Sequence, residues 1–366
     1  MGVISFARGI PSPDLLPVAE FGECARAIVD RDGGRVLNYG PPGGYAPLRE
    51  WVAARHGVAP ERVILTNGSL QGFNLVAQLL FAAGGRALVE APTYDRTLKA
   101  LASVGAEVTG VAVTDQGVDV DALADAIETG APLQLVYTIP TFQNPSGHTL
   151  SLRGRQALVA LARERDLLVY EDDPYTLVRF AGEALPTLHE LSGGDNVIYS
   201  SSFSKTVAPG IRVGYLVLPE RLVAPIEELA SWSYLSPTIF VQGALYEFLD
   251  RGHLDRHVDR VCAELLARRD AMLRALEREL PEGARWNEPE GGYFLWLELP
   301  AGVDADTLLA RAGEAGVTFV KGADFYAGAG GEEAARLAFS YASAEEIDEG
   351  VTRLGGLVRE LAAIPA

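Results

Sequence analysis

The sequence predicts an α/β protein in which a mainly parallel sheet of seven strands lies between helices. Two observations indicate this class. Seven short runs rich in β-branched residues follow one another through the middle of the 366-residue chain, and helical segments of about 10–15 residues separate most of them. Short apolar strands that alternate with helices are typical of parallel sheets covered on both faces.

The predicted strands are Val63–Thr66, Arg86–Glu90, Glu107–Val113, Leu133–Thr138, Leu167–Glu171, Asn196–Ser201 and Val213–Leu218. The helices predicted between them are Ser69–Phe81, Tyr94–Val104, Val120–Thr129 and Leu152–Arg165. In open parallel sheets, ligands bind beyond the carboxyl ends of the strands. Residues that directly follow a strand are therefore the first candidates for a functional site.

The pattern changes after Pro219, where helical periodicity dominates from Glu220 to Leu280. Strands are then predicted at Tyr293–Leu299, Val317–Val320 and Leu337–Tyr341, and helices at Asp304–Ala315 and Ala344–Leu361. This part resembles a smaller C-terminal α/β domain, and we expect the boundary near Leu280.

Composition excludes several classes of function. The net charge of −18 argues against nucleic acid as a partner, because phosphate-binding surfaces need clustered Lys and Arg. Cys24 and Cys262 are too far apart in sequence to form a metal motif, and we expect neither a metal site nor a disulfide. No apolar run approaches the length of about 20 residues that spans a membrane, and no signal peptide is evident. We therefore expect a cytoplasmic protein without a membrane partner.

Only three of the 31 basic residues are lysines, namely Lys99, Lys205 and Lys321. Lys205 follows a predicted strand, with Ser202 and Ser204 before it and Arg212 after it. A lysine that forms a Schiff base with a phosphorylated cofactor needs neighbours that hold the phosphate, and two hydroxyls and a guanidinium suit a dianion. A lone surface lysine is the ordinary alternative, but it does not explain this spacing.

The segment Asn67–Gln71 connects a predicted strand to a helix. Gly68 permits a tight turn, and the amides of Ser69 to Gln71 would open the helix at a natural anion site. Ser69 could equally be an ordinary N-cap. Beside the Lys205 segment, this turn becomes a second wall for a phosphate.

Three further segments follow predicted strands. Asp172 and Tyr175 lie three residues apart across a turn that contains Pro174, and acidic residues at the end of a buried strand are costly unless they are paired. Asn144 lies among turn residues, and Tyr94 could stack on a planar ring. Each could also be a simple loop or turn residue.

Together, these motifs resemble the fold type I pyridoxal-phosphate enzymes of the class I and II aminotransferase group. The likeness is strongest to the subgroup of 2-aminoadipate and kynurenine aminotransferases and to the aminotransferase-like domains of bacterial regulators. It runs from Phe6 to Tyr341, and the segment from Ser202 to Tyr215 is its most specific part. The resemblance implies a large cofactor-binding domain at 30–280. It also implies a small domain formed by residues 1–29 together with 281–366.

The resemblance implies a role for each matching residue. Lys205 would form the Schiff base with pyridoxal 5′-phosphate and move the substrate proton, and Asp172 would pair with the pyridine nitrogen. Tyr175 and Asn144 would bind the phenolic oxygen, and Tyr94 would stack on the ring. The phosphate would be held by Ser69, the Leu70 amide, Ser202, Ser204 and Arg212. Arg336 would bind the substrate α-carboxylate, and Tyr39 would reach the cofactor of a neighbouring subunit in a homodimer.

Two basic residues depart from the family pattern. Lys321 stands where the family usually has proline, and it is either a solvent-facing loop residue or a residue at the mouth of the site. Arg8 belongs to the segment that lines the substrate side-chain pocket in this subgroup. It would either pair with an acidic substrate or remain a surface arginine.

The resemblance implies ping-pong transamination between an amino acid and a 2-oxo acid, with 2-oxoglutarate as the expected acceptor. One alternative is another pyridoxal-phosphate reaction, carried out by a lyase, decarboxylase, cyclase or oxidase, because one cofactor serves many reactions. Arg336 speaks against decarboxylation because it would retain the α-carboxylate. A non-catalytic effector-binding domain is the other alternative. The regulators that contain one carry an N-terminal DNA-binding domain, whereas the motifs here begin at Phe6 and the charge is −18, so we expect an enzyme.

Overall fold

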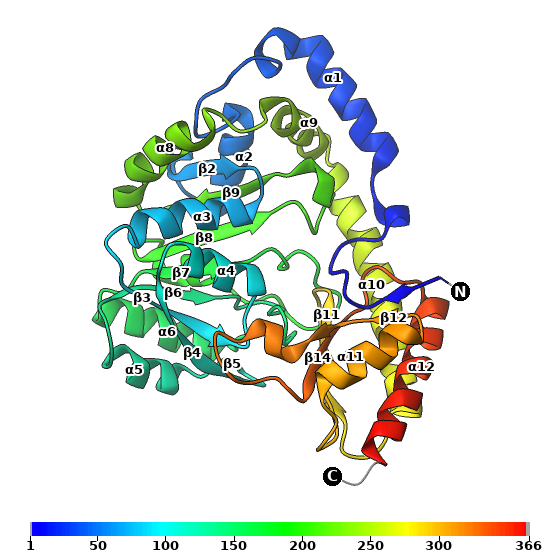
Figure 1. The fold of residues 1–366 in the computed structure, drawn as a ribbon. Coiled ribbons are helices and arrows are strands. Elements are labelled where there is room, and N and C mark those ends of the chain that lie inside the picture. Colours follow the sequence, from blue (N-terminus) through cyan, green and yellow to red (C-terminus); the bar gives the residue numbers. More distant parts are fainter. Residues whose placement is uncertain (1, 364–366) are drawn as a thin grey trace.

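The computed structural model describes residues 2–363 and confirms the α/β class. Its main sheet has eight strands in the order β2-β9-β8-β7-β6-β3-β4-β5 (Figure 1). The seven predicted strands are present as β2 (Val63–Thr66), β3 (Arg86–Ala91), β4 (Glu107–Thr114), β6 (Leu133–Thr138), β7 (Val169–Asp172), β8 (Val197–Ser202) and β9 (Gly214–Val217). The eighth strand, β5 (Gly117–Val118), was not predicted, because two residues are too few to show a period.

The central strands β4, β3, β6, β7 and β8 run parallel, whereas β9 runs antiparallel to both β8 and β2. Thr138 pairs with Glu171, and Asp172 pairs with Ser200. This register brings the carboxyl ends of β6, β7 and β8 to one edge of the sheet. All residues of β7 and β8 are buried, as expected for strands covered on both faces.

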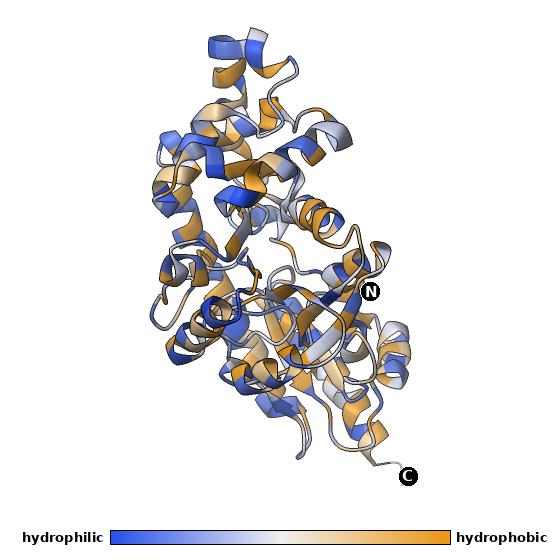
Figure 2. Cartoon of the chain, turned by 90° about the vertical axis from the view of Figure 1, so that its left-hand side faces the viewer, coloured by the Kyte–Doolittle hydropathy of each residue, from blue (hydrophilic) through white to orange (hydrophobic). Residues whose placement is uncertain are grey.

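Helices cover both faces of the sheet. On one face α3 (Ser69–Leu80), α4 (Asp95–Ser103) and α8 (Glu220–Tyr234) share a core with alternate strand residues such as Leu135 and Tyr137. On the other face α5 (Val120–Ile127), α6 (Leu152–Glu164) and α7 (Leu188–Ser192) pack against the intervening residues, including Val136. In Figure 2, helices of the chain carry both hydrophobic (orange) and hydrophilic (blue) residues, which is typical of amphipathic helices packed on a core.

A second, antiparallel sheet follows the long helix α10 (His253–Glu279). Its order is β10 (Arg285–Trp286), β11 (Phe294–Glu298), β14 (Ala334–Ala338) and β13 (Val320–Lys321), and α11 (Ala305–Glu314) and α12 (Ala344–Ala362) accompany it. The predicted strand Leu337–Tyr341 is displaced by three residues in the structure. Ala334 and Ala335 open the strand but have low β propensity, so their pattern did not reveal it.

The N-terminal segment joins this second part of the molecule. Strand β1 (Ile4–Ser5) pairs with β12 (Val317–Thr318), and the Phe6 carbonyl accepts a 2.7 Å hydrogen bond from the Ala338 amide. The chain then continues through α1 (Val18–Val36), which packs on α9 (Ile239–Asp250) and leads to α2 (Ala46–His56) (Figure 1). Within residues 2–363, no helix has the length and apolar character needed to cross a membrane.

Candidate active site

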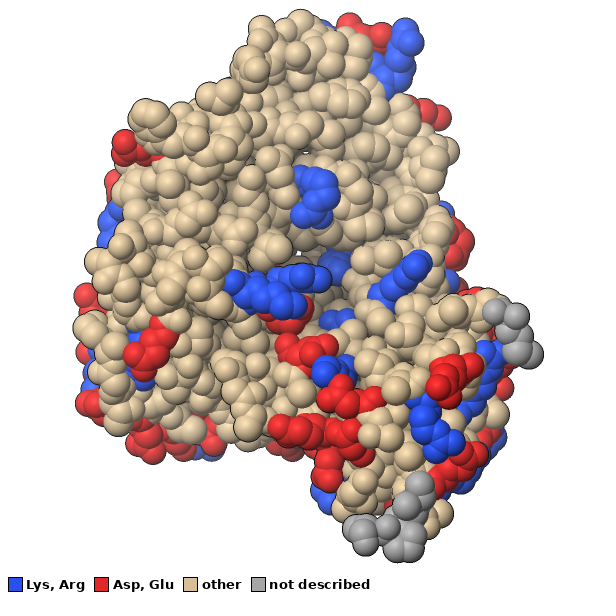
Figure 3. Space-filling view, viewed as in Figure 1, with Lys and Arg blue, Asp and Glu red and all other residues tan. Residues whose placement is uncertain are grey.

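A cavity of about 420 Å³ lies at the carboxyl ends of the central strands. Eleven of the thirteen predicted site residues line it: Ser69, Leu70, Tyr94, Asn144, Asp172, Tyr175, Ser202, Ser204, Lys205, Arg212 and Arg336. These residues come from segments spread over more than 260 positions of the chain. Figure 3 shows Lys and Arg side chains gathered near the middle of this face, around its central hollow.

Lys205 lies in the turn after β8, with its amine inside the cavity. Nζ donates a hydrogen bond to the Gly9 carbonyl of the N-terminal segment, and it lies 5.9 Å and 5.3 Å from the ring centres of Tyr175 and Tyr293. Burial, and then the positive charges of Arg336 and Arg212, lower the pKa of Lys205 from 10.5 to about 7. The amine is therefore partly uncharged near neutral pH and can act as a nucleophile or a base.

Asp172 closes β7 and points into the same cavity. Its Oδ2 accepts a 2.7 Å hydrogen bond from the Tyr137 hydroxyl, whereas its Oδ1 is buried with no partner among the described residues. Burial raises the pKa of Asp172 to about 6, although the Tyr137 hydrogen bond opposes the rise. An unpartnered buried carboxylate oxygen calls for a hydrogen-bond donor from a ligand, because leaving it unpaired is costly.

The neighbours of Asp172 on the strand are buried acids that point to the other face of the sheet. Glu171 accepts hydrogen bonds from the amides of Leu188 and His189, and Asp173 accepts one from the Tyr199 hydroxyl at 3.0 Å. Each of the three buried carboxylates therefore accepts at least one hydrogen bond, as expected for acidic residues at the end of a buried strand. Only Asp172 keeps a free oxygen on the cavity side.

The opposite end of the cavity is suited to an anion. Gly68, and not Ser69, is the N-cap of α3, so the alternative of Ser69 as an ordinary N-cap does not apply. The Gln71 amide donates back to the Gly68 carbonyl, whereas the amides of Ser69 and Leu70 donate no hydrogen bond within residues 2–363. Two free amides at a helix N-terminus form an anion site.

Arg212 completes this end with Ser202 and Ser204. Its Nη1 donates to Ser204 Oγ at 3.3 Å, and its Nη2 donates to the Asn67 carbonyl at 3.2 Å. Gly68 has a φ of +96°, and a Cβ atom there would lie 2.1 Å from Arg212 Nη2. Glycine is required at this position both for the turn and for the close approach of the guanidinium.

Arg336 lies on β14 and reaches the cavity from the second sheet. Its Nη1 donates to Asn144 Oδ1 at 3.0 Å, and its Nη2 donates to the Ala7 carbonyl at 2.9 Å. The guanidinium carbon lies 4.2 Å from the ring centre of Phe294, and burial lowers its pKa to about 10. This guanidinium lies against aromatic rings and donates one hydrogen bond from each of Nη1 and Nη2, and it can bind a carboxylate.

Three basic or aromatic candidates lie elsewhere. Arg8 is exposed, and its Nη1 donates to the Tyr341 hydroxyl at 3.0 Å. Tyr39 is 80 % exposed and does not line this cavity. Lys321 is the last residue of strand β13 and not a loop residue, and its amine pairs with Asp306 at 2.6 Å. It does not line the cavity.

Sequence reasoning missed several residues that shape the site. The Gly9 carbonyl holds the Lys205 amine, the Tyr293 hydroxyl donates a 2.7 Å hydrogen bond to the Lys205 carbonyl, and Tyr137 holds Asp172. Tyr137 lies one residue before the carboxyl end of β6, and that position was its only signal. Gly9 and Tyr293 gave none, because their contacts join segments that are distant in sequence.

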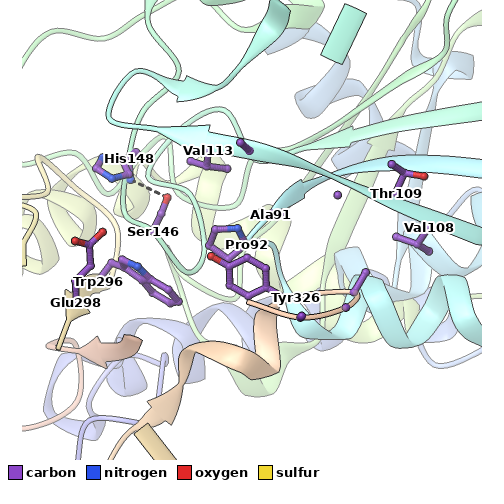
Figure 4. Close-up of a pocket in the computed structure, with 15 residues that line it drawn as sticks. Ala91, Pro92, Val108, Thr109, Val113, Ser146, His148, Trp296, Glu298 and Tyr326 are labelled. Atoms are coloured by element: carbon purple, nitrogen blue, oxygen red, sulfur yellow. Dashed lines mark hydrogen bonds between the residues drawn. The ribbon is translucent and has the colours of Figure 1, made fainter. Parts of the chain in front are cut away.

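A larger open hollow of about 750 Å³ lies between the edge of β4 and the loop that follows Phe325. His148, Glu298, Trp296 and Tyr326 surround it, and the His148 amide donates to Ser146 Oγ at 3.3 Å (Figure 4). No lysine or arginine lines this hollow. It therefore offers no lysine or arginine to pair with a phosphate or a substrate carboxylate, and the smaller cavity is the candidate active site.

The residues of the smaller cavity fit pyridoxal phosphate as a set. The unpartnered Asp172 oxygen can pair with a protonated ring nitrogen, and the Lys205 amine can bind an aldehyde. The two free amides and Arg212 can hold a phosphate. Among residues 2–363 no cluster of His, Cys, Asp and Glu could hold a metal ion.

Comparison with known proteins agrees with this reading. The family model for aminotransferase class I and II matches residues 3–354. A 2-aminoadipate transaminase of Thermus thermophilus is 38% identical over 366 residues, which cover 99% of this chain and 92% of the relative. An aromatic-amino-acid aminotransferase of Thermococcus litoralis is 34% identical over 98% of this chain and 88% of its own length.

Solved structures of aminotransferases have the same fold as this chain. The crystal structure of an α-aminoadipate aminotransferase from Thermus thermophilus, complexed with N-(5′-phosphopyridoxyl)-L-leucine, superposes with a TM-score of 0.94. The match covers 99% of this chain and 93% of that one at 38% identity. The bound compound in that structure is a pyridoxal-phosphate adduct of an amino acid.

Proposed function

Because the chain belongs to the class I and II aminotransferase family and is a pyridoxal-phosphate-dependent aminotransferase, we propose that the cavity around Lys205 is its active site. The observation that carries this proposal is the placement of the Lys205 amine, the unpartnered Asp172 oxygen and Arg212 in one cavity. Its substrates are amino acids and 2-oxo acids. We propose 2-oxoglutarate as the amino acceptor.

Each residue has a task that follows from its surroundings. When bound, pyridoxal phosphate supplies a conjugated ring that withdraws electrons from the substrate α-carbon. Lys205 would hold the cofactor through its Nζ, and this amine would take the proton from the substrate Cα. The Gly9 carbonyl, which holds Nζ, orients this amine. The lowered pKa of Lys205 suits a base that works near neutral pH.

The other residues orient the cofactor and the substrate. Asp172 keeps the ring nitrogen protonated, and Tyr137 positions Asp172. Ser69, the Leu70 amide, Ser202, Ser204 and Arg212 hold the phosphate. Tyr94 would stack on the ring, while Tyr175 and Asn144 would bind its phenolic oxygen. Arg336 binds the α-carboxylate, and the contact of its guanidinium with Asn144 couples the two binding tasks.

We also propose a homodimer and retain the predicted division into domains at 30–280 and at 1–29 with 281–366. Four large apolar side chains are strongly exposed, two of them directly after α1 and two at the end of α8: Leu37, Tyr39, Trp232 and Leu235. The upper part of the face in Figure 3 carries few charged side chains. Large exposed apolar side chains are typical of protein interfaces. In such a dimer Tyr39 would contribute to the partner's site. The cytoplasmic location remains a prediction.

A panel of amino acids tests the reaction. The purified protein is incubated with pyridoxal phosphate, 2-oxoglutarate and one amino acid at a time, and glutamate is measured. Glutamate with an equal amount of the new 2-oxo acid is the expected result. Release of ammonia, CO2 or peroxide without glutamate would instead identify a lyase, a decarboxylase or an oxidase.

A further inference from the structure

A buried glutamate near the carboxyl end of β3 has no task in the proposed function. Glu90 is 2% exposed, and the three hydrogen bonds that its carboxyl group accepts come from neutral groups. Burial raises the pKa of Glu90 to about 7, although these hydrogen bonds oppose the rise. Burying a carboxyl group is costly, and here only hydrogen bonds to neighbouring segments offset that cost.

The hydrogen bonds of Glu90 join β3 to the segment that follows β6. Its Oε1 accepts a 2.6 Å hydrogen bond from the hydroxyl of Thr138, the last residue of β6. Its Oε2 accepts one of 3.1 Å from the Ile139 amide and one of 3.0 Å from Gln143 Nε2. One carboxyl group therefore holds both the beginning and the end of the turn that leads to Asn144.

Gln143 extends this contact to both sides of Asn144. Its Nε2 also donates a 2.7 Å hydrogen bond to the Pro92 carbonyl, and its Oε1 accepts one of 2.8 Å from the Ser146 amide. Pro92 and Ser146 line the larger hollow of Figure 4, whereas Asn144 lines the active-site cavity. The backbone before and after Asn144 is thus fixed from the side that faces away from the cavity.

The orientation of the Asn144 side chain determines which group it offers to a ligand. The side chain is buried, and its Oδ1 accepts the 3.0 Å hydrogen bond from Arg336 Nη1. Its Nδ2 donates no hydrogen bond within residues 2–363, so a donor is available on the cavity side. An oxygen that carries negative charge requires such a donor and would be repelled by Oδ1.

We propose that Glu90 is a positioning residue, which holds Asn144 through Gln143 so that Nδ2 meets the phenolic oxygen of the cofactor. The inference rests on the proposed function, because it assumes that Asn144 binds this oxygen. A hydrogen bond to the oxygen stabilises its negative charge, and the Lys205 nitrogen joined to the cofactor then loses its proton at lower pH. Loss of the hydrogen bond should therefore raise the midpoint of that transition.

The absorbance of the cofactor-loaded protein, titrated between pH 5 and 10, measures this midpoint without turnover. Both Asn144→Ala and Glu90→Ala are expected to raise it, by about one unit. Glu90→Gln can keep all three contacts, because the Thr138 hydroxyl can accept a hydrogen bond from the new amide, and its midpoint should stay within about 0.3 units. Removal of a nearby negative charge would instead lower the midpoint, so a fall in both Glu90 variants would overturn the inference.

A double-mutant cycle tests whether Glu90 acts through Asn144. In the Asn144→Ala background, Glu90→Ala should add less than about 0.3 units, because the donor that it positions is already absent. Gln143→Met removes the connecting amide, leaves Glu90 in place and should raise the midpoint by the same amount as Glu90→Ala. It also tests the inference if Glu90→Ala does not fold. Shifts that add in full would overturn the inference.

Glu171→Ala is the matched control for the loss of a buried carboxylate. Glu171 lies on β7, points to the other face of the sheet and holds the amides of Leu188 and His189. Its removal should lower thermal stability without moving the midpoint. An unshifted midpoint in Asn144→Ala would refute the role proposed for Asn144, and the inference with it. A shift in Asn144→Ala that neither Glu90→Ala nor Gln143→Met reproduces would overturn the inference alone.

Discussion

The hydroxyl of Tyr137 on β6 donates a 2.7 Å hydrogen bond to Oδ2 of Asp172 on the neighbouring strand β7. Both side chains are buried, and no other described residue bonds the second carboxylate oxygen. This pair therefore aims a single free oxygen of Asp172 into the cavity. It also opposes the rise in pKa that burial imposes on Asp172.

Replacing Tyr137 with Phe should move the acid limb of the pH–activity profile to higher pH. The lost hydrogen bond stabilised the charged carboxylate, so the pKa of Asp172 should rise above about 6, by about one unit. The measurement is kcat/KM between pH 5 and 9. Tyr170→Phe is the matched control, because the Tyr170 ring stacks beside Tyr137 while Asp172 Oδ2 accepts its hydrogen bond from Tyr137. An acid limb that does not move in Tyr137→Phe would contradict the proposal that Tyr137 positions Asp172.

Lys205→Ala should abolish transamination, with a fall of at least about 10³-fold, because the amine both binds the cofactor and moves the substrate proton. Borohydride treatment followed by mass spectrometry should fix the cofactor on the wild-type peptide that contains Lys205, and on no peptide of the variant. Lys321→Ala, which removes a surface lysine, serves as the control. Turnover at the normal rate in Lys205→Ala would sink the mechanism.

Capture of pyridoxal phosphate by the apoprotein should increase with pH around a midpoint near 7. The amine reacts only when unprotonated, and burial and two arginines lower its pKa from 10.5 to about 7. Arg336→Gln removes one of those positive charges, so its midpoint should lie at higher pH. The rate of the absorbance change on mixing is the measurement. A midpoint that shifts to lower pH in Arg336→Gln contradicts this account.

Arg336→Ala should lower kcat/KM for all amino donors about 100-fold while the cofactor stays bound. The loss follows from removing a buried guanidinium that pairs with the α-carboxylate common to every substrate. Amino-acid kinetics and the cofactor absorbance, measured on the same preparation, distinguish weaker substrate binding from loss of the cofactor. If the variant lost activity toward acidic donors alone, Arg336 would instead be a side-chain determinant.

Trp232→Glu should convert the proposed dimer to a monomer and lower activity, since the tryptophan is 83% exposed on α8 in the isolated chain. Sedimentation velocity measures the state of assembly. Leu152→Glu is the matched control, because Leu152 is also an exposed apolar residue but begins α6 on the other face of the sheet. Equal behaviour of the two variants would contradict an interface at Trp232.

Local sequence was sufficient to determine the strands and helices of the main sheet and most residues of the cavity. β-branched strand runs, a Gly-containing turn and polar residues after strands are short-range signals, and the rule that ligands bind at the carboxyl ends connects them. The strands that were missed or misplaced also have a local explanation. The two-residue β5 and the alanine-rich start of β14 carry too little local pattern to be recognised.

Only the tertiary structure decided which groups face one another inside the cavity. The Gly9 carbonyl reaches Lys205 across 196 positions, and Arg336 reaches Asn144 across 192. The fold also placed the Arg8 guanidinium against the Tyr341 hydroxyl, outside the cavity, whereas the sequence left open whether Arg8 faces the substrate. Arg96, in contrast, lines the cavity. The physical reason is that charge, burial and hydrogen-bond partners depend on the packing of distant segments. The sequence determines the chemical groups available, and the fold determines which of them are buried, paired or free to bind a substrate.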